Sequence, residues 1–176
     1  MRPFLSQGVL SLATSNRAIQ IDEEALQTAV SHFLTTRPYH ACLLLVHPAL
    51  VHLQAAAQHL TRQYACPHLS VGLVLSETLL PVAPQQHSRH AGQILRQSVK
   101  NQAPGPLLCT DIDLLFEPAF SLDPLWLLRQ MSRQTSLIVT WPGTFHDNVL
   151  AYALPEHAHY RTWTSPDLCP YCIIAL

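Results

Sequence analysis

The sequence predicts an α/β protein with a doubly wound, mainly parallel sheet and helices on both faces. Two continuous apolar runs, ACLLLV at 41–46 and LLCT at 107–110, are typical of strands buried on both faces, since strands that face water on one side alternate in polarity. A third run at 137–141 stops at Pro142-Gly143. Helical segments separate the runs, and this alternation favours parallel pairing through crossover connections.

The remaining elements follow in order along the chain. Helices are predicted at 22–34, 49–64, 91–102 and 123–131. Further strands are expected at 71–75, 149–154 and 171–176. Residues 76–89 contain Pro81 and Pro84 and are interpreted as a loop or a broken helix. Residues 1–20 are expected to form an N-terminal arm, and residues 21–176 a single domain of ordinary size.

Composition narrows the functional class. Apolar residues make up 48% of the chain and charged residues 12%, about half of the ~25% that is usual for soluble domains. This deficit favours a protein that works inside an assembly. The net charge of −1 gives no electrostatic footprint for nucleic acid. Five cysteines, two of them inside apolar runs, and the absence of an apolar run of about 18 residues favour a reduced, cytoplasmic protein without a membrane span.

Residues 47–54 follow the first apolar run, where a doubly wound sheet binds its ligand beyond the carboxyl ends of the strands. A phosphate loop here would read G-x-x-x-x-G-K-[ST], because glycine amides wrap the phosphates while Lys and a hydroxyl reach phosphate and magnesium. The chain reads HPALVHLQ. His47 and His52 replace the two glycines, Leu53 replaces Lys, and Gln54 replaces the hydroxyl residue. The sequence therefore predicts a vestigial nucleotide site.

Asp111 and Asp113 follow the run at 107–110, and strand-end acids of this kind can hold magnesium beside a nucleotide. They are also common as solvated or capping groups, and both interpretations stay open. Because the phosphate loop is degenerate, no cofactor is expected and ATP with Mg²⁺ is disfavoured. No histidine has Cys or carboxylate companions at the spacing of a zinc site, so no metal is predicted.

Five segments share one order and spacing with a known family. They are LSETLL at 75–80, TDIDLLFEP at 110–118, DPLWLLRQMSR at 123–133, VTWPG at 139–143 and LAYALPEHAHYRTW at 150–163. Together they resemble the BrxF family of BREX bacteriophage-exclusion systems, across roughly residues 40–176. Members of that family are small P-loop-containing proteins encoded beside a methyltransferase, a PglZ-type phosphatase-like protein, a large ATPase and helicase-like proteins.

The resemblance implies a P-loop NTPase-like fold and a role in antiphage defence. Since the phosphate loop is lost, the expected function is a non-catalytic, P-loop-derived subunit that acts in assembly or regulation of a BREX-type complex, and the chain is not expected to be an enzyme. Its expected partners are other defence proteins or further copies of itself. Contact with DNA is expected only through the complex.

Two enzymatic alternatives stay open. One is an active ATPase or GTPase with an atypical phosphate site. The other is a thiol oxidoreductase that uses Cys169-Pro170-Tyr171-Cys172. This motif leads into a strand-like tail, whereas an active C-x-x-C opens a helix that lowers the thiol pKa. The sequence therefore favours buried structural thiols.

Arg133 and four aromatic residues are candidates for contacts between subunits. Arg133 follows the helix at 123–131, from where it could reach a neighbouring subunit's phosphate; a cation at this place also stabilises the helix dipole without any partner. Aromatic side chains with a polar group suit interfaces, and two of the four are expected in the core. These interface candidates are Trp141, Tyr152, Tyr160 and Trp163.

Overall fold

The computed structural model describes residues 22–176, and the arm expected at 1–20 lies outside the described residues. The helices are α1 (Glu23–Thr36), α2 (Leu50–Tyr64), α3 (Val71–Leu79), α4 (His87–Lys100) and α5 (Pro124–Met131). The strands are β1 (Cys42–His47), β2 (His68–Ser70), β3 (Leu107–Thr110), β4 (Leu137–His146), β5 (Val149–Tyr152), β6 (Arg161–Thr164) and β7 (Ile173–Ala175). Short 3-10 helices lie at Pro84–Gln86, Ile112–Phe116, Pro118–Phe120 and Pro170–Cys172.

Five of the strands form a parallel sheet in the order β2-β3-β4-β1-β7. β1 lies between β4 and β7, so that Leu44 is level with Val139 on one side and Ile173 on the other. β3 pairs with β2 and β4. The three runs that the sequence predicts as buried strands are the three central strands, and the predicted mainly parallel α/β sheet is confirmed.

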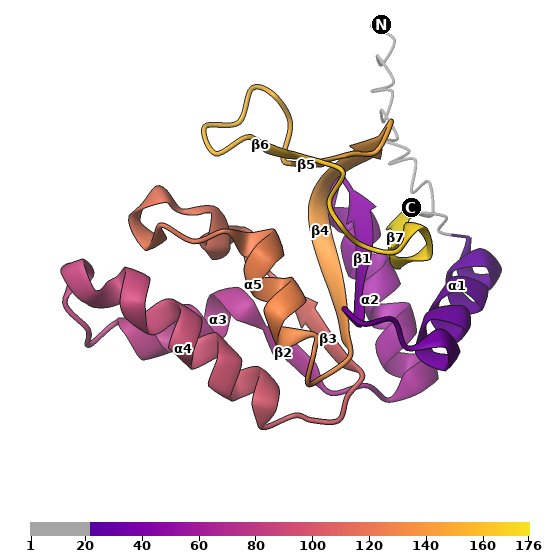
Figure 1. Ribbon diagram of the computed structural model, residues 1–176, viewed down its shortest axis with the longest axis horizontal. Coiled ribbons are helices and arrows are strands. Elements are labelled where there is room, and N and C mark those ends of the chain that lie inside the picture. Colours follow the sequence, from indigo (N-terminus) through magenta and orange to yellow (C-terminus); the bar gives the residue numbers. More distant parts are fainter. Residues whose placement is uncertain (1–21) are drawn as a thin grey trace, which may run out of the picture.

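Helices cover both faces of the sheet, and β1 shows how the chain achieves this. Leu44 and Val46 belong to a core shared with α3, α4 and α5, whereas Leu43 and Leu45 belong to a second core with α1 and α2. Successive side chains of a strand point to opposite faces, so a continuous apolar run supplies both cores. Figure 1 shows α4 and α5 in front of the sheet and α2 behind it.

The segment 71–75, which the sequence predicts as a strand, is the first half of α3, so this prediction is wrong. The strand of this unit is β2, immediately before the helix. The Ser70 side chain accepts a hydrogen bond from the Leu73 amide and caps α3. The buried residues recur at helical spacing: Val71, Leu75 and Leu79. A short apolar run alone does not separate a buried strand from a buried helix.

Residues 76–89, interpreted as a loop or a broken helix, fit the second alternative, because α3 continues to Leu79, a 3-10 helix lies at Pro84–Gln86 and α4 begins at His87. The helices predicted at 22–34, 49–64 and 123–131 are present with small shifts at their ends. Two of the predicted tail strands are present as β5 and β7, each shorter than predicted.

β4 continues beyond Trp141, where its prediction ends, because Pro142 and Gly143 take part in strand pairing. The Pro142 carbonyl accepts a hydrogen bond from the Ala153 amide, and Gly143 is level with Tyr152 of β5. β4, β5 and β6 form an antiparallel extension, which Figure 1 shows beyond the carboxyl end of β1. The sequence does not predict β6, since its residues are mostly exposed and carry no apolar pattern.

The four aromatic interface candidates divide as the sequence analysis expects, with two in the core. Trp141 and Tyr152 are buried, which removes them as interface residues. Trp163 is partly buried and packs with its ring centroid 5.3 Å from that of Trp141. Tyr160 is 41% exposed. Only Tyr160 and Trp163 of the four therefore have surface to offer a partner.

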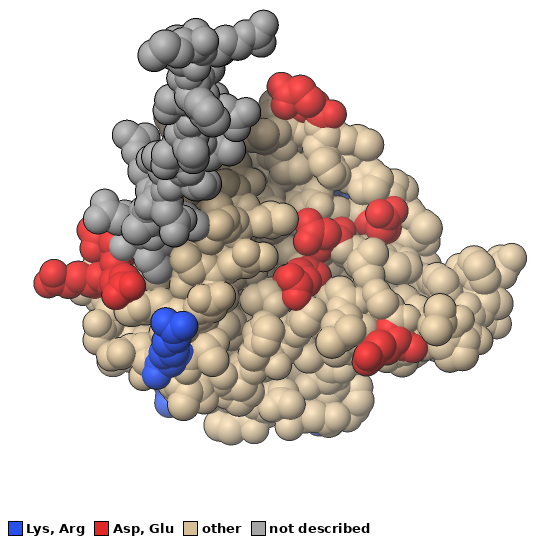
Figure 2. All heavy atoms as spheres, turned by 180° about the vertical axis from the view of Figure 1, so that it is seen from behind, with Lys and Arg blue, Asp and Glu red and all other residues tan. Residues whose placement is uncertain are grey.

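Charged side chains are sparse on the face shown in Figure 2, as the 12% charged composition implies. The acidic side chains are scattered across this face, and basic side chains are seen mainly at the lower left. Most of the surface in this view is therefore neither positive nor negative.

Candidate functional site

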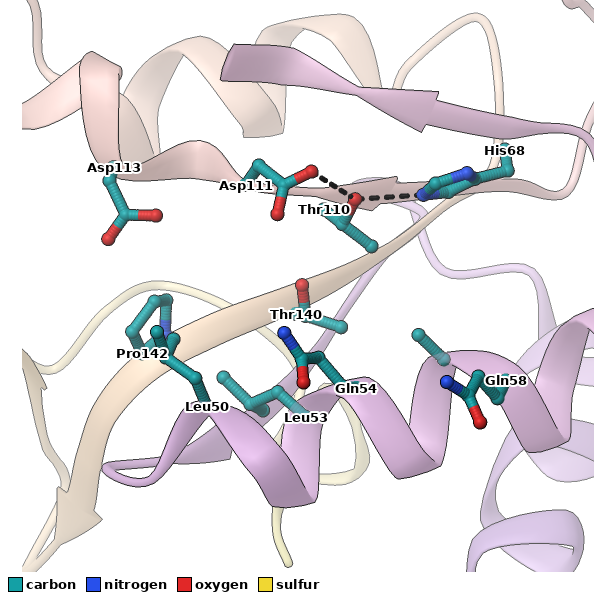
Figure 3. A pocket seen from close by; sticks show the side chains of 11 residues that line it. Leu50, Leu53, Gln54, Gln58, His68, Thr110, Asp111, Asp113, Thr140 and Pro142 are labelled. Atoms are coloured by element: carbon teal, nitrogen blue, oxygen red, sulfur yellow. Dashed lines mark hydrogen bonds between the residues drawn. The ribbon is translucent and has the colours of Figure 1, made fainter. Parts of the chain in front are cut away.

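A pocket of about 270 Å³ lies between α2 and the sheet, lined by the carboxyl end of β3, by Thr140 and Pro142 of β4 and by His68 of β2. This is the place where doubly wound sheets bind ligands. Four of the six residues predicted for the nucleotide site line it: Leu53, Gln54, Asp111 and Asp113. His68 and Thr140 line it as well, as Figure 3 shows. The other two predicted residues, His47 and His52, are not part of its lining.

Asp111 is held by hydrogen bonds from two neighbouring strands. Its Oδ2 accepts from the Ser70 hydroxyl at 2.6 Å and from the Thr110 hydroxyl at 3.0 Å. Thr110 Oγ1 lies 2.8 Å from His68 Nε2. The Thr110 hydroxyl donates its proton to Asp111, so its oxygen can only accept from His68. This requires that the His68 ring carries a proton on Nε2. The result is a fixed carboxylate at the mouth of the pocket (Figure 3).

The backbone at Asp111 also fits closely to the neighbouring helix. Asp111 has a φ of +54°, in the left-handed region that is uncommon for residues other than glycine. A Cβ on Gly72 of α3 would lie 3.0 Å from the Asp111 carbonyl oxygen. Glycine at 72 therefore lets α3 approach the turn that carries Asp111.

Asp113 is fixed by a different part of the chain. Its Oδ1 accepts a hydrogen bond of 3.0 Å from the Tyr152 hydroxyl of β5. The Tyr152 ring stacks on Phe116, which anchors the hydroxyl. Burial, together with the neighbouring Asp113 carboxylate, raises the pKa of Tyr152 above its ordinary value, so this phenol stays protonated and donates at neutral pH.

The connection between β1 and α2 consists of two residues, Pro48 and Ala49. A phosphate loop needs a longer glycine-rich segment, whose amides converge on the anion ahead of the helix. Here α2 already begins at Leu50, so Leu53 and Gln54 lie within the helix. Leu53 is 3% exposed and forms part of the apolar wall of the pocket. The phosphate loop is therefore missing as a structure as well as in sequence.

His47 and His52 stack on each other with ring centroids 4.0 Å apart. His47 Nδ1 accepts a hydrogen bond of 2.9 Å from the Ala49 amide. This bond satisfies one of the amides at the start of α2 that an anion would otherwise meet. Burial lowers the pKa of His47 and outweighs the hydrogen bond to the Ala49 backbone, which acts in the opposite direction; the neighbouring His52 lowers the pKa further. His47 therefore resists protonation, and it is a poor source of the positive charge that the missing Lys would supply.

We expect the protein to lose stability as the pH falls below about 6.5, the ordinary His pKa. Because the pKa of His47 is lowered in the folded state, the unfolded chain takes up a proton that the folded chain resists. The stabilisation of the folded state that comes from neutral His47 is fully present above about pH 6.5, and it is lost as the pH falls toward the folded-state pKa of His47. Urea unfolding of the wild type and of His47→Asn across this range checks the expectation.

Asn at position 47 keeps an acceptor for the Ala49 amide but does not titrate, so His47→Asn should depend less on pH. His146→Asn makes the same change at a side chain that is 85% exposed and serves as the matched control. An unchanged pH dependence in His47→Asn would contradict the role given to His47.

The charged groups of the pocket are acids. Among the described residues that line it, Asp111 and Asp113 carry charge at neutral pH, and none is Lys or Arg. Arg133 precedes β4, whereas the pocket lies at the opposite, carboxyl end of the strands. The Arg133 guanidinium lies 5.1 Å from the centre of the Tyr39 ring. It therefore takes no part in the pocket of its own subunit.

Cys172 of the C-x-x-C motif lies in a different environment from that of a reactive thiol. Residues 170–172 form a short 3-10 helix that leads into β7, and Cys172 is buried. Burial, followed by the neighbouring Cys169 thiol, raises the pKa of Cys172 to about 12. A thiol of this kind carries little thiolate at neutral pH. Cys169 and Cys172 are both free.

Within residues 22–176, no group of three or more His, Cys, Asp or Glu side chains is arranged to hold a metal ion. In the same part of the chain, none of the helices combines the length and the apolar character that crossing a membrane requires.

The sequence analysis did not identify Ser70, His68 or Tyr152 as parts of the site. Ser70 and His68 belong to β2, whose position beside β3 depends on the pairing of strands distant in sequence. Tyr152 reaches Asp113 only because the antiparallel extension folds back over the end of β3. In the sequence, these three residues are distinguished only as polar residues within or beside short apolar runs.

No protein-family description, no curated protein and no solved structure matches this chain.

Proposed function

We propose that the chain is a non-catalytic, P-loop-derived subunit of a BREX-type antiphage defence system, acting in assembly or regulation of the complex. The proposal that the subunit is non-catalytic rests on the connection between β1 and α2, which is only two residues long. Consecutive amides and a Lys at a helix N-terminus bind the phosphates in a working site. Here the Ala49 amide is bonded to His47, and Leu53 stands in the wall of the pocket.

The charge of the pocket supports the same conclusion. A nucleoside triphosphate brings several negative charges, and the carboxylates of Asp111 and Asp113 would repel them unless a cation lay between. A magnesium ion in a P-loop site also needs the hydroxyl residue that follows Lys, and Gln54 occupies that position. The alternative of an active ATPase or GTPase is therefore disfavoured. The thiol oxidoreductase is disfavoured by geometry, because residues 170–172 form only a short 3-10 helix before β7, whereas an active C-x-x-C opens an α-helix whose N-terminus lowers the thiol pKa.

The defence role is supported by the resemblance to the BrxF family, three of whose five segments meet at one edge of the sheet. The segments at 110–118, 139–143 and 150–163 contribute Asp111, Pro142 and Tyr152 to one edge of the sheet. The other two segments, at 75–80 and 123–133, cover the end of α3 and all of α5 and do not line this edge. The proposal includes a cytoplasmic location, other defence proteins or further copies as partners, and DNA contact only through the complex.

Deleting the gene from its host and measuring the plating efficiency of phages tests the proposal. We expect plating to rise to the level of a strain without the defence system. Wild-type protein and the Cys169→Ser, Cys172→Ser double variant should both restore protection, because neither nucleotide hydrolysis nor thiol chemistry is part of the proposed role. Unchanged plating after deletion would contradict the defence role, and failure of the double variant while it remains folded would favour the oxidoreductase.

A further inference from the structure

Cys169 and Cys172 are the two ends of a tight turn. The Cys172 amide donates a hydrogen bond of 2.8 Å to the Cys169 carbonyl oxygen, and Pro170 and Tyr171 lie between them. The Cα atoms at the ends of such a turn lie less than ~7 Å apart, and a disulfide needs a separation of ~4.4–6.8 Å. Both thiols are free, and the two side chains are close enough to share a hydrogen bond. The turn therefore brings the two sulfur atoms within reach of a covalent bond.

The sheet keeps the other cysteines apart from this pair and from one another. Cys42 and Cys109 belong to the core of α3, α4 and α5, and β4 separates their strands by ~10 Å. Cys66, Cys169 and Cys172 belong to the core of α1 and α2, on the other face. Cys66 precedes β2 and Cys172 precedes β7, at opposite edges of the parallel sheet. All five cysteines lie within residues 22–176, so Cys169 and Cys172 are the one pair that this fold can join within a chain.

The two thiols differ in their access to solvent. Cys169 is partly exposed, whereas Cys172 is buried. Burial, followed by the neighbouring Cys169 thiol, raises the pKa of Cys172 to about 12, so Cys172 is not the first to react. An accessible cysteine beside a second thiol is the arrangement of an attacking and a resolving cysteine. A reagent in solution therefore meets Cys169 first.

The turn fixes the start of β7. β7 has three residues and lies at the edge of the parallel sheet, where it pairs with β1 (Figure 1). Within the turn, the Tyr171 ring packs edge to face against His32 of α1, with 5.0 Å between the ring centroids. A short edge strand with few buried contacts opens at a low free-energy cost. The rigidity of the turn therefore limits how often β7 leaves β1.

We propose that Cys169 and Cys172 form a reversible disulfide that holds β7 on β1 when the chain meets an oxidising disulfide such as glutathione disulfide. The Cys169 thiolate attacks one sulfur of glutathione disulfide, which forms a mixed disulfide and releases one glutathione. The Cys172 thiol then loses its proton, and its sulfur attacks the Cys169 sulfur, which closes the protein disulfide and releases the second glutathione. The protein loses two electrons and two protons, and the two glutathione thiols gain them.

The second step is assisted by the first. In the mixed disulfide Cys169 no longer carries a thiol, which removes its contribution to the raised pKa of Cys172, although the effect of burial stays. The proposal does not rest on the defence role. It also leaves the expected protection by the double Ser variant unchanged, because the disulfide is absent from the reduced chain.

Thiol trapping on the full chain tests whether the bond forms. The reduced protein is incubated with glutathione disulfide, blocked with N-ethylmaleimide in denaturant, and mapped by mass spectrometry. The untreated chain should carry five blocked cysteines, and the treated chain should carry two fewer and a link between Cys169 and Cys172 that dithiothreitol reverses. A mixed disulfide that persists on the wild type, five blocked cysteines after treatment, or a link to another cysteine or chain would overturn the proposal.

Three variants test the order of the steps. Cys172→Ala should stop at the mixed disulfide on Cys169, because the resolving thiol is gone. Cys169→Ser should take up no glutathione at Cys172, because that thiol is buried. Cys66→Ala removes another buried thiol of the same core and should give the same link as the wild type. Modification of Cys172 in Cys169→Ser at the rate seen for Cys169 would contradict the assigned order and overturn the proposal.

Hydrogen exchange tests the consequence for β7. The amides of residues 173–176 should exchange ~5-fold more slowly or slower still in the oxidised chain, because the disulfide restricts the backbone at the start of the strand. Cys169→Ser treated with the same oxidant should exchange like the reduced wild type. The peptide that covers β5 is the internal control and should exchange equally in both states. Equal exchange of residues 173–176 in the oxidised and reduced chains would overturn the role given to the disulfide.

Discussion

Gly143→Ala is expected to lower the free energy of unfolding by on the order of 3 kcal/mol, at the upper end of the usual range for overpacking. A Cβ at position 143 would lie 1.9 Å from the Ala151 carbonyl oxygen and 2.9 Å from its carbonyl carbon. Both are backbone atoms of the paired strand β5, so relief requires a shift of the β4–β5 ladder. For a chain of this size, this loss lowers the melting temperature by on the order of 10 °C.

The same carbonyl oxygen has a second role, which raises the cost of any shift. Ala151 O accepts a hydrogen bond of 2.8 Å from Nε1 of the buried Trp141. Trp141 packs edge to face against Phe116, whose ring stacks on Tyr152. Moving β5 therefore disturbs a buried aromatic cluster and, through the Tyr152 hydroxyl, the position of Asp113.

Gly92→Ala is the matched control for this prediction. Gly92 lies inside α4, and a Cβ there would lie 3.5 Å from the nearest atom, at the flexible end of the Arg96 side chain. The same chemical change should stabilise the protein by about 0.5–1 kcal/mol, because Ala is the better helix former. Thermal unfolding of both variants checks the pair, and a Gly143→Ala protein that melts with the wild type would contradict the close approach of β4 and β5.

The central sheet could be predicted from the sequence because its strands are buried on both faces. Leu43, Leu44 and Leu45 fill two cores at once, and a continuous apolar run is the pattern this burial requires. The same rule fails at 71–75, where the apolar residues serve one face of a helix. It also fails at β6, which lies largely in solvent and so has no apolar pattern to recognise.

The candidate site was only partly predictable. Asp111 and Asp113 could be placed together because they follow one strand. Their partners, Ser70 and Tyr152, lie about 40 residues away on either side, and which strands they join depends on pairing that no local pattern encodes. His47 and His52 are assigned to the site only by their positions in the phosphate-loop pattern, and that pattern does not show that the two rings stack on each other outside the pocket lining.

A second large effect is expected in nucleotide binding, which should be absent in the micromolar range. Losing the charge-assisted contact of the P-loop Lys costs on the order of 2 to 3 kcal/mol, or ~30- to 150-fold in affinity. The two-residue connection removes the amide cradle in addition, and the neighbouring carboxylates repel phosphate. Lowering the pH to about 6 should help little, because burial lowers the pKa of His47.

Titration of labelled ATP and GTP with Mg²⁺ at about pH 7.5, with phosphate release followed in parallel, tests the central claim most directly. The account predicts dissociation constants no tighter than ~1 mM, no phosphate release above the protein-free rate, and the same result for Asp111→Ala. Micromolar binding that Asp111→Ala abolishes would contradict it and would identify the pocket as a working nucleotide site.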